Sequence, residues 1–94
     1  MLTKDALYLI ALCQTFLDKT ISDKDFCPEF EKFFVDDNNN FTEEEAFFFD
    51  DILEGIAFYE PDKEERDAEP TYIDENELKR RILEALNKIG SLEK

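Results

Sequence analysis

The sequence predicts an all-α protein, an antiparallel four-helix bundle with one long acidic link between the third and fourth helices. Apolar residues recur at helical spacing in four stretches, and each stretch follows a residue type that commonly caps a helix. No stretch of the sequence alternates apolar and polar residues for long enough to predict a strand. A chain of 94 residues has the size of one domain, so residues 1–94 are expected to form a single helical domain.

The first two helices are predicted by the same pattern. The first is expected to begin after Thr3 and the second after Ser22, because Thr and Ser are common N-cap residues. In both helices the apolar residues follow the spacing i, i+1, i+4, i+7 and i+8 of one buried face. They are Leu9, Ile10, Cys13, Phe16 and Leu17 in the first helix, and Phe26, Cys27, Phe30, Phe33 and Phe34 in the second.

The third and fourth helices carry stronger start signals. Thr42 and Glu45 have the spacing of a capping box, and Asp74 precedes a second acidic first turn. Gly90 is expected just after the end of the fourth helix, where glycine commonly ends helices. The predicted buried residues are Phe48 or Phe49, Ile52, Leu53 and Ile56 in the third helix, and Leu78, Ile82, Ala85, Leu86 and Ile89 in the fourth.

The links between these helices differ in length. Residues 19–21 and 37–41 form short links, whereas residues 59–73 form a long polar one that contains Pro61 and Pro70. Connections in helical bundles usually take about two to eight residues. A longer polar link is more often functional than idle, so the long link is a candidate binding segment.

The net charge of −14 is concentrated in one part of the chain. Residues 36–77 hold 17 acidic and two basic side chains, a net charge of −15, whereas the other 52 residues hold eight acidic and nine basic ones. Such a chain repels nucleic acid and anionic membrane surfaces. A charged partner is therefore expected to be a basic protein, without direct nucleic-acid or membrane contact.

The composition argues against catalysis and metal binding. The chain has no His, which removes the commonest general base near neutral pH and the commonest metal ligand. Asp36, Asn38 and Asn40 stand at positions 1, 3 and 5 of a calcium loop, but Phe41 and Phe47 occupy the positions that need Gly and Glu. We therefore predict no catalytic residue, no metal site and no cofactor, and a protein that is not an enzyme.

The remaining composition suggests a cytoplasmic protein. The first apolar run is only about eight residues long, whereas a membrane span needs roughly 20. Cys13 and Cys27 are too few for the disulfide framework of a small secreted domain. Both belong to apolar stripes, so reduced core thiols are expected rather than a disulfide or metal pair.

Part of the acidic charge has no local structural reason. Carboxylates favour helix N-termini, which accounts for residues 43–45 and 74–77 but not for the acids of the later third helix or of the long link. These acids are candidates for a protein-binding surface. Phe47 is a further candidate, because three adjacent residues of a helix cannot all point inward in the run Phe47-Phe48-Phe49.

One stretch of sequence resembles a known family. The segments that carry the resemblance are Phe58-Tyr59-Glu60-Pro61-Asp62, then Arg66, then Tyr72-Ile73-Asp74-Glu75, followed by Leu78-Lys79-Arg80-Arg81-Ile82-Leu83. With these segments, the second half of the chain resembles the immunity proteins of the colicin D type. The resemblance covers roughly residues 56–89. It implies a cytoplasmic inhibitor that binds a cognate bacterial nuclease toxin one to one. The toxin would be a ribonuclease that cleaves transfer RNA, blocked by carboxylates placed where the RNA backbone would lie.

The charge pattern and the resemblance together define the predicted site. Its toxin-binding residues are Glu60, Asp62, Glu64, Glu65, Asp67, Glu54, Asp50 and Asp51. Structural roles are predicted for Pro61, which restricts the backbone between two of these acids, for Arg66, which is expected to pair with an acid of the link, and for Tyr72. The alternative function is an acidic adaptor or nucleic-acid mimic that regulates a basic host protein.

Overall fold

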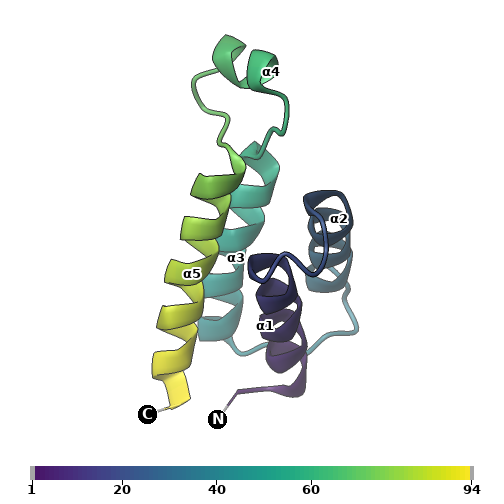
Figure 1. Cartoon of the computed structure of the whole chain (residues 1–94). Coiled ribbons are helices and arrows are strands. Elements are labelled where there is room, and N and C mark those ends of the chain that lie inside the picture. The colour runs from purple at the N-terminus through teal and green to yellow at the C-terminus, as the bar shows by residue number, and fades with distance from the viewer. Residues whose placement is uncertain (1, 94) are drawn as a thin grey trace.

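The computed structural model describes residues 2–93, and the helices in this range account for most of its residues. The helices are α1 (Lys4–Leu17), α2 (Asp23–Phe34), α3 (Glu43–Phe58), α4 (Lys63–Ala68) and α5 (Glu75–Gly90), followed by a 3₁₀ turn at Ser91–Glu93 (Figure 1). The predicted all-α class is confirmed. The number of α-helices in the described range is five rather than four, because the long link contains α4.

The long helices lie in alternating directions along the chain (Figure 1). α3 and α5 lie side by side, α1 and α2 lie next to them, and α4 projects beyond the end where α3 stops and α5 starts. The projecting helix gives the molecule an elongated shape of 42 × 25 × 24 Å. None of the helices in residues 2–93 is long and apolar enough to cross a membrane.

Each long helix begins at the residue that the sequence predicts. The side chains of Thr3, Ser22 and Asp74 each accept a hydrogen bond from a backbone N–H in the first turn of α1, α2 and α5. Thr42 and Glu45 form the predicted capping box at the start of α3. These oxygens satisfy N–H groups that have no partner inside the helix.

Glu45 also connects the starts of α1 and α3. Its Oε2 accepts the backbone N–H of Thr3 at 2.9 Å, and its Oε1 accepts the Thr3 hydroxyl at 2.7 Å and the backbone N–H of Thr42 at 3.0 Å. The Thr3 hydroxyl in turn accepts the N–H of Ala6 inside α1. Only 1% of Glu45 is exposed, so a buried carboxylate fixes the first turns of two helices to each other.

Phenylalanine rings from α1, α2 and α3 form the centre of the core. Phe16 stacks on Phe26 with ring centroids 4.4 Å apart, and Phe30 meets Phe49 edge-on at 6.2 Å. The third helix therefore buries Phe49, whereas Phe48 is half-buried. From α5 the core receives four fully or nearly fully buried aliphatic side chains, which are Leu78, Ile82, Ala85 and Ile89.

The two glycines have different roles. Gly55 is buried where α3 meets α5, and a Cβ on it would lie 3.2 Å from Cδ1 of Leu78 and 3.5 Å from Cδ of Arg81. Gly90 lies inside α5 rather than just after it, and its φ is not positive. The prediction of a terminating glycine is therefore wrong, because the helix continues to Ser91 and tightens into the 3₁₀ turn.

The close approach at Gly55 gives a first test of the packing. Gly55→Leu is expected to lower the free energy of unfolding by about 2 kcal/mol, because extra carbon atoms overpack the α3–α5 contact. Gly55→Ala is expected to be nearly neutral, since a gain of about 1 kcal/mol in helix propensity offsets one tight contact. Urea denaturation measures both values. A leucine variant as stable as the wild type would contradict the close packing of these helices.

Candidate functional site

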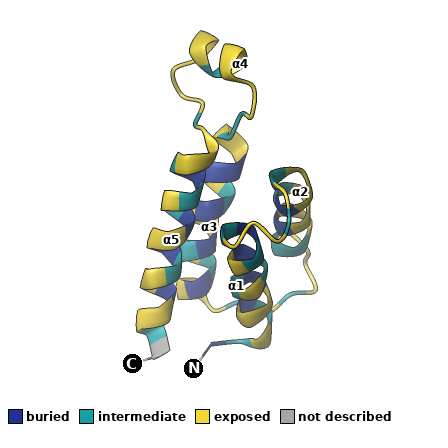
Figure 2. Ribbon diagram, in the orientation of Figure 1, coloured by how far each residue is buried: buried dark blue, intermediate teal, exposed yellow. Residues whose placement is uncertain are grey.

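The long link forms an exposed acidic projection, which we call the acidic tip and define as residues 60–69. α4 lies within it and has no buried residue, and Figure 2 shows exposure along nearly the whole segment. The basic side chains of the tip are Lys63 and Arg66. Its six acidic residues are Glu60, Asp62, Glu64, Glu65, Asp67 and Glu69.

Hydrogen bonds between the two ends of the link hold the base of the tip closed. Tyr59 and Ile73 form an isolated parallel β-bridge, in which the N–H of Ile73 donates to the carbonyl of Phe58 at 2.9 Å. The N–H of Glu60 donates to the carbonyl of Ile73 at 3.0 Å. The Tyr59 hydroxyl donates to Oδ2 of Asp23 in α2 at 2.6 Å. The tip is thus attached to the main body of helices at a fixed point.

The bond between Tyr59 and Asp23 gives a second test. Burial and the acceptor Asp23 both raise the pKa of the Tyr59 hydroxyl, so this group stays a donor near neutral pH. Tyr59→Phe is expected to lower the free energy of unfolding by about 1 kcal/mol. Faster hydrogen exchange is expected at the amides of Glu60 and Ile73, with little change in the centre of α5. Unchanged exchange at these two amides would contradict an anchoring role for the tyrosine.

Two of the predicted binding acids also shape the backbone of the tip. Oε1 of Glu60 accepts the N–H of Asp62 at 3.1 Å, and Oδ1 of Asp62 accepts the N–H of Glu64 at 2.9 Å as the N-cap of α4. Arg66 donates from Nη1 to the backbone carbonyl of Glu60 at 2.8 Å. The expected partner of Arg66 is therefore corrected from a carboxylate to a carbonyl, because its guanidinium closes the turn around Pro61.

The three acids on α4 itself are exposed. Asp67 forms an ion pair with Lys63 at 3.6 Å, and more than two thirds of both side chains are exposed, so solvent screens the pair strongly. Within the described residues, Glu64 and Glu65 have no ion-pair partner. The outer surface of the tip therefore presents carboxylates that an incoming basic group can reach.

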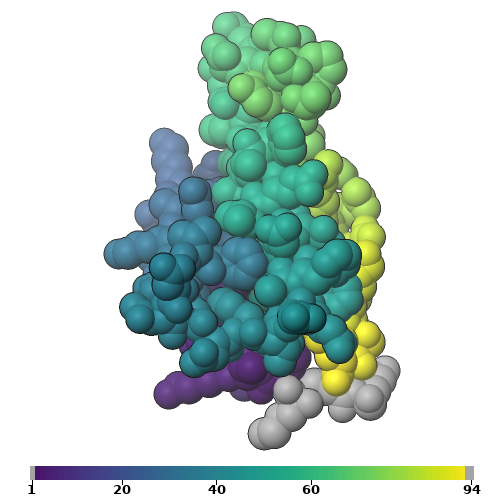
Figure 3. Space-filling view, turned by 180° about the vertical axis from the view of Figure 1, so that it is seen from behind, coloured from purple at the N-terminus to yellow at the C-terminus, as the bar shows by residue number. Residues whose placement is uncertain are grey.

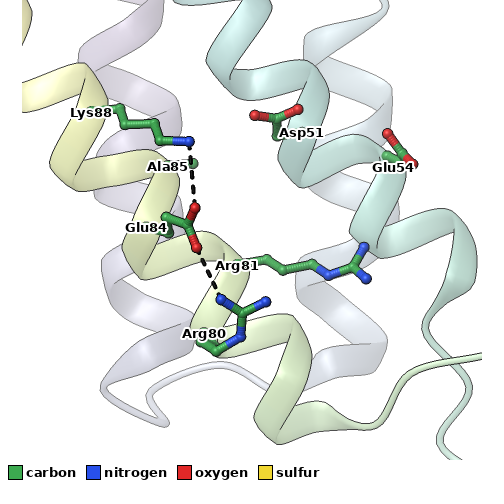
Figure 4. A pocket seen from close by; sticks show the side chains of 7 residues that line it. All are labelled: Asp51, Glu54, Arg80, Arg81, Glu84, Ala85 and Lys88. Atoms are coloured by element: carbon green, nitrogen blue, oxygen red, sulfur yellow. Dashed lines mark hydrogen bonds and ion pairs between the residues drawn. The ribbon is translucent and has the colours of Figure 1, made fainter.

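The acids of α3 lie on the helix body, apart from the tip. Asp50, Asp51 and Glu54 are exposed. Asp51 and Glu54 line a shallow groove of about 230 Å³ between α3 and α5, and Figure 4 shows Arg81 extending across it towards α3. The predicted site residues thus fall into two groups, one on the tip and one along α3.

Ion pairs along α5 neutralise much of the basic side of this groove. Arg80 pairs with Glu77 at 2.6 Å and with Glu84 at 2.9 Å, and Lys88 pairs with Glu84 at 3.4 Å (Figure 4 draws the two Glu84 pairs). Hydrogen bonds from Arg80 and Arg81 lower the pKa of Glu77 to about 2. The basic residues of α5 are therefore engaged within their own helix.

Three further side chains singled out in the sequence are exposed. Phe47 is exposed on α3, which confirms that the Phe47-Phe48-Phe49 run does not all point inward. Pro61 lies exposed between Glu60 and Asp62, and the ring of Tyr72 is exposed near the base of the tip. A structural role for Tyr72 stays a prediction.

Sequence reasoning missed the residues that anchor the tip. Tyr59 belongs to the segment that carries the family resemblance, and its bond to Asp23 spans 36 positions, so no local pattern points to this bond. Asp23 stands in the first turn of α2, where an acidic residue is already explained by the helix dipole. An aromatic residue at the end of a helix, next to a proline-containing link, was the available signal.

The two cysteines and the asparagine run 38–40 are accounted for by the fold and do not form a binding site in the described residues. Cys13 and Cys27 are free, and burial raises the pKa of their thiols to about 12 and about 11, so both thiols stay protonated near neutral pH. Oδ1 of Asp36 accepts the N–H of Asn38 at 2.9 Å, which forms a turn after α2. In the described part of the chain, no group of three His, Cys, Asp or Glu residues is placed to hold a metal ion.

Comparison with known proteins identifies the family. The family described as bacterial self-protective colicin-like immunity matches residues 6–89, which reach from the first turn of α1 to the last turn of α5. No curated protein and no solved structure gives a significant match. Because the match covers nearly the whole chain, including the acidic tip and its base, the protein belongs to the colicin-like immunity family.

Proposed function

We propose that this protein protects its bacterial host by binding a cognate nuclease toxin and covering the toxin's basic active site. The observation that carries the proposal is the projecting acidic tip, with six carboxylates and two basic side chains on a segment without a buried helix residue. Membership of the colicin-like immunity family implies that the partner is a toxin. The negative charge of the tip implies that the toxin surface it contacts is basic.

The proposed mechanism is imitation of a nucleic-acid backbone. A nuclease holds phosphates with Arg and Lys side chains, and the same side chains can form charge-assisted hydrogen bonds with carboxylates. Glu60 and Asp62 are placed at the centre of the interface, with Glu64, Glu65 and Asp67 around them. Because Glu60 and Asp62 each give one oxygen to the backbone of the tip, their positions are fixed before binding, which reduces the entropy lost on association.

Charge also favours fast association. The screening length at physiological salt is about 8 Å, so the fields of neighbouring carboxylates on the tip add together for an approaching basic protein. Such steering can raise association rates to about 10⁸ M⁻¹s⁻¹. We propose a one-to-one complex in the cytoplasm with a ribonuclease that cleaves transfer RNA.

Co-expression tests this function directly. Cells that express the toxin encoded next to the gene for this protein are expected to die and to accumulate cleaved transfer RNA. Cells that also express this protein are expected to survive with intact transfer RNA. Death of the second cells would contradict the immunity function, whereas survival with cleavage of a different substrate would contradict only the choice of transfer RNA.

A further inference from the structure

One face of α3 combines exposed aromatic rings with carboxylates, and we call it the α3 face. Phe47, Asp51, Glu54 and Phe58 follow the spacing i, i+4, i+7 and i+11, which places them above one another on a helix, and Asp50 lies beside them. Phe47 is 67% exposed and Phe58 is 37% exposed. The three carboxylates are exposed as well.

Phe47 is the most exposed aromatic side chain in the described residues. Four phenylalanine side chains are almost completely buried, and further rings pack against them. The Phe47 ring meets Phe48 edge-on, with centroids 5.6 Å apart, and most of its surface faces solvent. Aromatic side chains are enriched at protein interfaces relative to the rest of the protein surface.

The α3 face continues into the acidic tip. Phe58 is the last residue of α3, and its carbonyl accepts the N–H of Ile73 at the base of the tip. Figure 3, which views the molecule from behind, shows the surface of α3 in teal leading directly to the tip in green. One partner that covers the tip can therefore also contact the α3 face.

We propose, on the basis of the proposed function, that the α3 face binds arginine side chains of the toxin and that Phe47 is its anchor. A planar guanidinium can stack on an aromatic ring while it donates hydrogen bonds to a carboxylate. Asp50 and Asp51 stand one helical turn from Phe47, which places a carboxylate beside the ring. The toxin thus has a second basic surface, outside the part that holds RNA phosphates.

The charge around Phe47 argues for this partner over an apolar one. Asp51 and Glu54 lie between the two rings along the helix and Asp50 lies beside them, so an apolar surface pressed onto Phe47 would remove these carboxylates from water without a compensating partner. Burial of an unpaired carboxylate is strongly unfavourable. An arginine can cover the Phe47 ring and also form an ion pair with a neighbouring carboxylate, so neither group is left without a partner.

A substitution series at Phe47 tests the proposal with the purified, catalytically inactivated toxin domain encoded by the neighbouring gene. Phe47→Ala is expected to weaken binding at least 30-fold, the range of an interface anchor. Phe47→Tyr, which keeps the ring, is expected to stay within about threefold of the wild type. Phe47→Leu, which keeps apolar area without a ring, is expected to lose about tenfold. Titration calorimetry measures the affinities, and thermal unfolding checks that each variant is folded.

Leu83 provides the matched control, because it is an exposed apolar side chain, 51% exposed, in the middle of α5. Leu83→Ala is expected to bind within about threefold of the wild type. A photoreactive phenylalanine analogue at position 47 is expected to cross-link to the toxin next to an arginine, and the same analogue at position 83 is not.

The outcomes separate this inference from the proposed function. If the wild type binds the toxin but Phe47→Ala binds equally well, the inference fails and the proposed function stands. If Phe47→Leu binds as tightly as the wild type while Phe47→Ala does not, the arginine partner is contradicted. If the wild type does not bind the toxin at all, the proposed function itself fails.

Discussion

Asp62→Lys is expected to weaken toxin binding about 100-fold or more. The substitution places a positive charge where the proposed interface meets a basic cleft, and truncation or reversal of a buried interfacial charge typically costs several kcal/mol. A loss of about 2.7 kcal/mol corresponds to 100-fold in the dissociation constant. The effect is expected to shrink as salt rises, because salt screens both the attraction in the wild type and the repulsion in the variant.

The cap formed by Asp62 requires a control. Its Oδ1 accepts the N–H of Glu64 at the start of α4, and lysine cannot replace this acceptor. Asp62→Asn keeps a capping side chain and removes the charge, so it is expected to bind more weakly than the wild type but more tightly than Asp62→Lys. Glu31→Lys makes the same change of charge on an exposed position of α2 and is expected to have little effect.

Two results would remove Asp62 from the interface. The first is an affinity of Asp62→Lys within about threefold of the wild type, since a reversed charge in a basic cleft cannot be silent. The second is an equal loss for Glu31→Lys, because the effect would then follow the net charge of the protein rather than the position of the acid.

Glu45→Ala is expected to lower the free energy of unfolding by about 3 kcal/mol, the largest stability effect expected of a polar residue in this protein. The substitution removes the acceptor of the Thr3 and Thr42 N–H groups in a site that is almost closed to water. Both helix starts lose a bond, because the carboxylate joins α1 to α3. Urea denaturation at neutral pH measures the change, and a loss below about 1 kcal/mol would contradict this role.

The same carboxylate makes stability depend on pH. Burial alone would raise the pKa of Glu45, but the hydrogen bonds from Thr3 and Thr42 outweigh it and lower the pKa below its ordinary value. A carboxyl whose pKa is lower in the folded than in the unfolded chain stabilises the fold above its unfolded pKa. That contribution is lost as the pH falls through the folded pKa.

Comparison with Glu45→Gln isolates this contribution, because the amide does not titrate. The wild type is expected to be more stable than Glu45→Gln near neutral pH, and the difference is expected to shrink below about pH 4. Taking the difference also cancels the general effect of neutralising the many other acids of the chain. A difference that stays constant down to about pH 2 would show that the charged form of Glu45 is not the stabilising one.

Features set by neighbouring residues could be predicted from the sequence. The caps Thr3, Ser22, Thr42 and Asp74 act within one helical turn, so their signals are local and all four were found. α4 was missed because its six residues contain no apolar stripe, and hydrophobic periodicity has nothing to detect there.

Features set by distant residues could not be predicted in the same way. The capping box of Glu45 was visible, but its bonds to Thr3 span 42 positions and depend on how α1 meets α3. The choice of Phe49 over Phe48 likewise depends on where the second helix lies. The accumulation of acids was evident from the sequence. The position of Asp51 and Glu54 beside Arg81 depends on how α3 and α5 are aligned along their axes, which the sequence does not show.

The bridge between Tyr59 and Ile73 also bears on how such a protein can diversify. Because this bridge joins the two ends of the link at their base, the residues between them form a closed loop whose ends stay at fixed positions on the helical scaffold. Changes of sequence or length inside a closed loop cost little stability. On the proposed function, the part of toxin recognition that the acidic tip supplies can therefore change, or be grafted, within this loop while the helix-to-helix packing below it stays the same.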